Sequence, residues 1–107
     1  MKGLLGLAFT MTLGATGLAL AQDADVDAGK AYATEICAEC HAILPSEGNS
    51  PLLDAPSFQS VADMPGMTDL ALSVWLQTSH PTMPNIILEQ DDMRNVIAYI
   101  RSLQGKG

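Results

Sequence analysis

The sequence predicts an all-α domain with three main helices and proline-rich connections. Near the end of the 107-residue chain, apolar side chains recur at helical spacing: Met93, Val96, Ile97, Ile100 and Leu103. No stretch alternates between apolar and polar residues well enough to predict a strand. Prolines recur between the helical patterns, in 45–56 and again in 81–84, where they indicate irregular loops.

Residues 1–21 predict a secretory signal peptide. A lone lysine precedes an uncharged apolar run that ends on the small residues Ala19-Leu20-Ala21. This A-x-A sequence predicts cleavage after Ala21, which leaves residues 22–107 as one exported, periplasmic domain. The alternative is an uncleaved membrane anchor, because the run is only just short of the roughly 20 residues that span a bilayer. Glycines and threonines inside the run favour cleavage.

The first helix of the mature domain is expected over residues 28–40. Asp25 or Asp27 can cap its start, and its sequence AGKAYATEICAEC gives a partly amphipathic pattern. The two cysteines, Cys37 and Cys40, therefore lie at a helix end.

Two more main helices and one short helix are expected after the first loop. The short helix lies in 57–63, before a Pro-Gly pair interrupts it. Thr68 is the predicted N-cap of a helix over 69–78. The last helix lies in 89–105, where acidic residues crowd the first turn, a basic residue lies in the last turn and Gly105 can end it.

The composition excludes some partners and implies a bound group. A formal net charge of −7 argues against nucleic acid or an anionic membrane surface as partner. A domain of this size only marginally builds a stabilising core unaided, and aromatic residues make up only 5% of the chain. We therefore expect a non-protein group to help fill the interior.

Cys37 and Cys40 are the only cysteines, and His41 follows them at once. A thioredoxin-like dithiol needs a βαβ setting, for which the sequence predicts no strands. A structural zinc site needs four ligands, and the available soft donors are the two cysteines, His41 and the distant His80. Because Cys40 and His41 are adjacent, their side chains are poorly placed to bind one tetrahedral zinc ion together. The sequence therefore disfavours both dithiol exchange and a structural zinc site.

The C-x-x-C-H motif has a better use in haem attachment. Two thiols three residues apart lie near one another on a helical turn, so both can form thioethers with the two vinyl groups of one haem. The imidazole of the next residue can then ligate the iron. We expect one covalent haem c, held through Cys37 and Cys40, with His41 as an iron ligand.

Four segments together resemble a class I cytochrome c of the small, bacterial, periplasmic kind: GKAYATEICAECHAI, APSF, HPTMPN and VIAYIRSL. The resemblance covers most of residues 22–107. It implies a compact α-helical fold around haem c that passes single electrons between redox partner proteins. The expectation is thus a monomeric electron carrier and not an enzyme.

In that family the second axial ligand is usually a methionine in a loop just before the C-terminal helix, which matches Met83. The neighbouring prolines restrict this loop and lower the entropy lost on ligation. Met64 also precedes a proline, Met67 lies in the same loop as Met64, and His80 is a rival that would give a bis-histidine iron. Met93 lies on the apolar stripe of the last helix and is expected to fill the core.

The resemblance also assigns supporting roles. It points to the Pro56 carbonyl as the acceptor of the free ring N–H of His41. It also makes Gly29 the place where the first helix crosses the last near Tyr99. The family often has an aromatic residue four positions after that glycine, whereas this chain has Ala33 there and its aromatic residue one position earlier.

Two aromatic residues and one amide are weaker candidates near the haem. Trp75 and Tyr99 could reach a haem propionate through N–H or O–H, although aromatic residues at helical spacing are more often core. Asn85 could form a hydrogen bond near the Met83 sulfur, and loop structure explains this asparagine equally well.

Two other functions stay open at this point. One is a haem enzyme or gas sensor with an open sixth position, for which His80 is the only spare histidine. The other is a fixed cytochrome subunit of a dehydrogenase or oxidase complex. The sequence favours the diffusible carrier, because no convincing distal acid–base pair is found.

Overall fold

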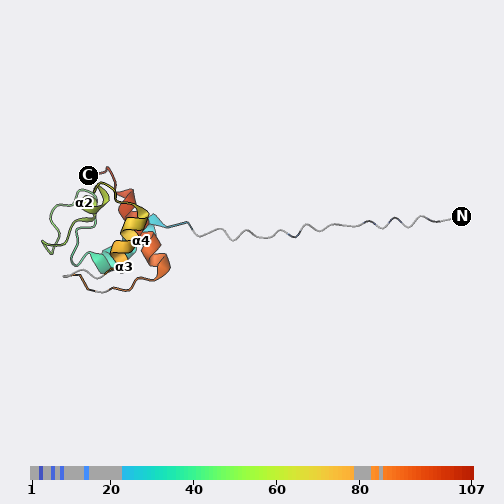
Figure 1. The fold of residues 1–107 in the computed structure, drawn as a ribbon, viewed down its shortest axis with the longest axis horizontal. Coiled ribbons are helices and arrows are strands. Elements are labelled where there is room, and N and C mark those ends of the chain that lie inside the picture. Colours follow the sequence, from blue (N-terminus) through green and yellow to red (C-terminus); the bar gives the residue numbers. More distant parts are fainter. Residues whose placement is uncertain are drawn as a thin grey trace.

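The computed structural model describes residues 23–78, 83–84 and 86–107, together with Gly3, Gly6, Ala8 and Gly14. The predicted signal peptide lies almost wholly outside the described residues, and so do His80 and Asn85. The described part of the chain is helical and contains no strand (Figure 1). The all-α class predicted from the sequence is therefore confirmed.

Five helical segments follow one another along the described residues: α1 (Val26–Tyr32), η1 (Ala33–Cys37), α2 (Phe58–Ala62), α3 (Asp69–Gln77) and α4 (Gln90–Ser102). Because η1 continues α1 without a break, the five segments correspond to the four predicted helices. The long connections between η1 and α2 and between α3 and α4 are the proline-rich segments.

Side-chain caps fix where three of these helices begin. Asp25, Ser57 and Thr68 each accept a hydrogen bond from a backbone N–H three residues further on, at 3.0, 3.1 and 3.1 Å respectively. Such caps satisfy N–H groups that have no partner inside the helix. The predicted cap at Thr68 is confirmed, and of the two aspartates proposed for the first helix Asp25 caps it.

The first helix differs from its prediction over residues 28–40 both in its bounds, which are 26–37, and in its geometry. It begins at Val26, and after Tyr32 it widens into the π-helical segment η1, in which the Ala38 N–H donates to the Ala33 carbonyl at 2.9 Å. Apolar periodicity does not predict this change from four-residue to five-residue spacing, because π segments are rare and depend on tertiary packing. Its consequence is that Cys37 ends a π turn rather than an α turn.

Helices α1 and α4 cross at Gly29. A Cβ on Gly29 would lie 1.9 Å from the Asn95 backbone oxygen and 3.0 Å from the Tyr99 Cβ, so only glycine fits there without movement of the backbone. The Asn95 side chain also accepts a hydrogen bond from the Asp25 N–H at 2.8 Å. The predicted crossing near Tyr99 is confirmed, and Ala33, one helical turn after Gly29, is fully buried.

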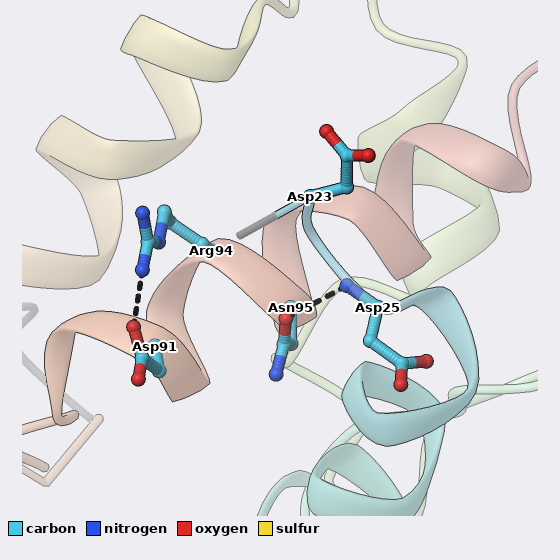
Figure 2. A pocket seen from close by; sticks show the side chains of 5 residues that line it. All are labelled: Asp23, Asp25, Asp91, Arg94 and Asn95. Atoms are coloured by element: carbon cyan, nitrogen blue, oxygen red, sulfur yellow. Dashed lines mark hydrogen bonds and ion pairs between the residues drawn. The ribbon is translucent and has the colours of Figure 1, made fainter. Parts of the chain in front are cut away.

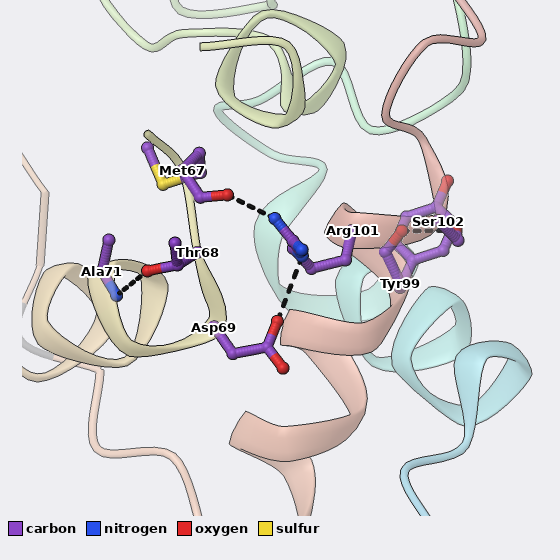
Figure 3. A network of polar contacts seen from close by, with 7 residues as sticks. All are labelled: Met67, Thr68, Asp69, Ala71, Tyr99, Arg101 and Ser102. Atoms are coloured by element: carbon purple, nitrogen blue, oxygen red, sulfur yellow. Dashed lines mark hydrogen bonds and ion pairs between the residues drawn. The ribbon is translucent and has the colours of Figure 1, made fainter. Parts of the chain in front are cut away.

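Arg101 joins the last turn of α4 to the start of α3. Its guanidinium donates to the Met67 carbonyl and pairs with the Asp69 carboxylate, with 3.1 Å between Nε and Oδ1 (Figure 3). Because Asp69 opens α3 directly after the Thr68 cap, this contact fixes the beginning of α3 against α4.

The core is built mainly on α4. Its buried apolar side chains, with those of the elements around it, are Ala33, Ile43, Phe58, Ala62, Met67, Leu72, Val96, Ile97, Tyr99, Ile100 and Leu103. The apolar stripe predicted for the last helix therefore faces inward. Met93 packs against this core from its edge, which agrees with its predicted role as filler.

Candidate functional site

The C-x-x-C-H motif forms one tight turn at the end of η1. Cys37 is the last residue of η1, and its carbonyl accepts hydrogen bonds from both the Cys40 N–H at 3.2 Å and the His41 N–H at 3.0 Å. The Cys40 carbonyl in turn accepts from the Leu52 N–H at 3.1 Å. The backbone hydrogen bonds therefore hold the two cysteines and the histidine on one turn of the chain.

The His41 ring is held by the loop that leads into α2. Its Nδ1 lies 2.6 Å from the Pro56 carbonyl oxygen. A carbonyl oxygen only accepts hydrogen bonds, so Nδ1 carries the hydrogen and the neutral ring keeps its lone pair on Nε2. This arrangement is typical of metal-ligating histidines, whose second nitrogen donates to a carbonyl or carboxylate, and it confirms the predicted contact with Pro56.

Two backbone contacts fix the segment after His41 against the loop and α2. The Ala42 carbonyl accepts from the Phe58 N–H at 2.8 Å, and the Ala42 N–H donates to the Ser50 Oγ at 2.9 Å. Ala42 and Ser50 are both buried. Pro56 therefore lies between two anchored residues, Ser50 before it and Phe58 after it. These contacts fix the position of the Pro56 carbonyl next to His41.

Cys37 and Cys40 are free thiols. Both are half-buried, and burial raises the pKa of the Cys37 thiol to about 11. Dithiol exchange proceeds through a thiolate, which is favoured by a lowered pKa. A thiol with a pKa this high is almost wholly protonated at neutral pH, which argues against redox exchange at Cys37.

Metal-binding clusters of the zinc type are absent from the described residues. No group of three or more His, Cys, Asp or Glu side chains in this part of the chain is placed to hold a metal ion. His80, the fourth soft donor considered from the sequence, lies outside the described residues.

The methionines proposed as sixth ligands occupy different environments. Met83 is half-buried and precedes Pro84. Met64 is 49% exposed, whereas Met67 is buried in the core with 7% exposure. Of these three methionine side chains, only that of Met67 is packed in the core.

Tyr99 and Trp75 also differ in their surroundings. The Tyr99 side chain is buried, and its O–H donates to the Ile43 carbonyl at 2.6 Å. This hydroxyl is therefore engaged with the backbone, and a role for Tyr99 toward a haem propionate is not supported. The Trp75 side chain is 55% exposed on α3.

Phe58 is a site residue that the sequence analysis missed. Its ring lies against the His41 imidazole, with 5.5 Å between ring centroids and 50° between ring planes. Phe58 follows Pro56 by two positions in APSF, so its nearness to the histidine could have been inferred once Pro56 was assigned as the acceptor.

An acidic pocket of about 360 Å³ lies elsewhere, between residues 23–25 and α4. Its lining consists of Asp23, Asp25, Asp91, Arg94 and Asn95 (Figure 2). Arg94 pairs with Asp91, and Asn95 accepts from the Asp25 backbone. The pocket shares no residue with the C-x-x-C-H turn.

No family model, curated protein or solved structure matches the chain. Within the described ranges, none of the helices is long and apolar enough to cross a bilayer.

Proposed function

We propose that this chain is a c-type cytochrome: an exported electron-transfer protein that holds one covalent haem c in a class I cytochrome c fold. The observation that carries the proposal is the His41 ring, directly after two cysteines, with Nδ1 held by the Pro56 carbonyl at 2.6 Å. This hydrogen bond leaves Nε2 free to ligate a metal.

The residues around the motif fit a haem. The Cys37 and Cys40 thiols would each add across a vinyl C=C bond, with sulfur joining one carbon and the thiol hydrogen the other, so that no electrons are lost or gained. Ile36 and Leu52 flank the turn and are 38% and 42% exposed. These apolar side chains offer surface that an apolar macrocycle would cover favourably.

His41 would ligate the iron through Nε2, and Met83 is the proposed second axial ligand. Met83 is half-buried in the segment before α4, and the prolines near it restrict its loop. Haem iron supplies a one-electron couple, and its potential is raised by Met/His ligation. If His41 and Met83 both bind the iron, little would have to reorganise when an electron moves, which would suit a carrier rather than an enzyme.

The charge of the chain suggests the character of its redox partners. Two of the basic side chains, Arg94 and Arg101, pair with Asp91 and Asp69, which leaves the acidic residues in large excess. A donor or acceptor protein with a basic surface would be attracted to this domain. Electron transfer to such a partner should slow as salt is added, because salt screens surface charges.

The test is an assay for covalent haem in the full chain expressed with export and a haem-attachment system. The purified protein is denatured in alkaline pyridine, and its reduced spectrum is recorded beside its mass and its count of alkylatable thiols. We expect a c-type haem spectrum, a mass increased by one haem and no free thiol.

Cysteine variants make the assay specific to the motif. In Cys37→Ala or Cys40→Ala one thioether is lost, and the spectrum should shift toward that of a haem with one free vinyl group. A matched control is Ser60→Ala, at an exposed position on α2, which leaves both thiols in place. A parent protein with two alkylatable thiols and no retained haem would overturn the proposal.

A further inference from the structure

We infer that Phe58 is a positioning residue for His41, which sets the orientation of the imidazole plane and through it the electronic state of the bound iron. This inference rests on the proposed function. Phe58 is a core residue, and the inference adds a second role, the orientation of the His41 ring.

The hydrogen bond to Pro56 fixes the His41 ring at one atom only. A carbonyl oxygen accepts hydrogen bonds over a broad range of directions, so the imidazole can still rotate about its Cβ–Cγ bond while Nδ1 stays within reach of the oxygen. The Phe58 ring limits this rotation, because its centroid lies 5.5 Å from that of the imidazole and the planes are tilted by 50°. Tilted aromatic pairs at this separation attract one another.

Phe58 can serve as a support because it is itself held. Its side chain is 6% exposed, and its backbone N–H donates to the Ala42 carbonyl at 2.8 Å. This hydrogen bond ties Phe58 to the residue directly after His41, so the two rings share one backbone frame.

Tyr99 supports Phe58 from a third element. The two ring centroids are 6.4 Å apart, and the Tyr99 hydroxyl donates to the Ile43 carbonyl at 2.6 Å. The row His41–Phe58–Tyr99 therefore runs from the motif through α2 to α4. A displacement of α4 would be transmitted to the imidazole by contact alone.

The test compares Phe58→Leu with the parent as intact ferric holoproteins. Leucine keeps an apolar side chain and removes the flat ring. The readouts are the electron paramagnetic resonance g-values and the proton NMR shifts of the haem methyl groups, which depend on the orientation of the axial ligand planes. We expect Phe58→Leu to change the spread of the four methyl shifts and to alter the reduction potential.

Two further variants separate positioning from general loosening of the core. Leu72→Val removes buried volume on α3, outside the aromatic row, and should lower stability with the methyl shifts unchanged. Phe58→Tyr keeps the ring and should resemble the parent more than Phe58→Leu does. If Phe58→Leu does not retain haem, Phe58→Met takes its place, because a methionine side chain adapts to irregular spaces.

The outcomes distinguish this inference from the proposed function. Parent-like methyl shifts in Phe58→Leu, or equal changes in Phe58→Leu and Leu72→Val, would overturn the positioning role while the haem protein stands. A parent chain without covalent haem would overturn the proposed function, and this inference with it.

Discussion

Gly29 of α1 lies so close to Asn95 of α4 that the two backbones are in contact. A Cβ on residue 29 would come within 1.9 Å of the Asn95 carbonyl oxygen and 2.4 Å of its carbonyl carbon. Because both obstructing atoms belong to the backbone, no side-chain rotation relieves the clash. The crossing of the first helix with the last therefore depends on this one glycine.

We expect Gly29→Ala to lower the free energy of unfolding by roughly 1–3 kcal/mol, the usual cost of overfilling a packed site. The better helix propensity of alanine, worth about 1 kcal/mol, offsets this only in part. Urea denaturation followed by circular dichroism gives the value. The matched control is Gly48→Ala, since a Cβ there meets nothing within 4 Å. Equal stabilities of the two variants would contradict the crossing as described.

Tyr99→Phe tests the buried hydrogen bond to Ile43. The variant keeps the ring in the core and leaves the Ile43 carbonyl without the donor that lies 2.6 Å from it. A buried acceptor left unsatisfied costs about 1–3 kcal/mol, and we expect a loss of stability in this range. Tyr32→Phe, at a half-buried position on α1, is the control and should cost less. A Tyr99→Phe variant as stable as the parent would show that the hydroxyl contributes nothing to stability.

The Asp63 carboxylate predicts a specific acid sensitivity. It accepts hydrogen bonds from the Gly105 N–H at 2.8 Å and from the Gln59 side chain at 2.9 Å. These two donors hold the pKa of Asp63 below its ordinary value. A carboxyl with a lowered folded-state pKa stabilises the fold above its unfolded pKa of about 3.9, and this contribution is lost as the pH falls through the folded value.

Asp63→Asn should therefore be less stable than the parent at pH 7, and the two proteins should converge as the pH falls below about 4. Urea unfolding of both proteins between pH 2 and pH 7 measures the difference. Thr68→Ala removes the cap of α3 without removing a carboxylate, so its difference from the parent should not depend on pH through this mechanism. A constant difference for Asp63→Asn across this range would refute the assignment.

Met83→Ala tests the proposed sixth ligand in the holoprotein. We expect loss of the weak charge-transfer band from methionine sulfur to ferric iron, together with a lower reduction potential, because methionine ligation raises the potential. Met64→Ala is the matched control, since Met64 also precedes a proline and is about half exposed. Loss of the band in Met64→Ala with its survival in Met83→Ala would move the ligand to Met64. His80→Ala addresses the bis-histidine alternative in the same spectra.

The helices and the C-x-x-C-H turn could be predicted because their determinants are local. Thr68 caps α3 through the N–H three residues ahead of it, and the α4 stripe appears directly in the spacing of its apolar residues. The Pro56 contact was reached by resemblance rather than from the residues themselves. Nothing in the sequence predicted the widening of the first helix at η1, because packing decides between α and π turns.

The sequence by itself determined that this chain is helical and that Cys37, Cys40 and His41 lie within one short motif. Both follow from residue type and short-range spacing, whereas the crossing at Gly29 was reached by resemblance. Only the tertiary structure decided which partners hold that unit: Phe58 against the imidazole, and Tyr99 bound to the Ile43 carbonyl rather than facing a haem. These contacts join residues 17 to 56 positions apart, and short-range patterns carry no information about which distant groups meet when the core closes.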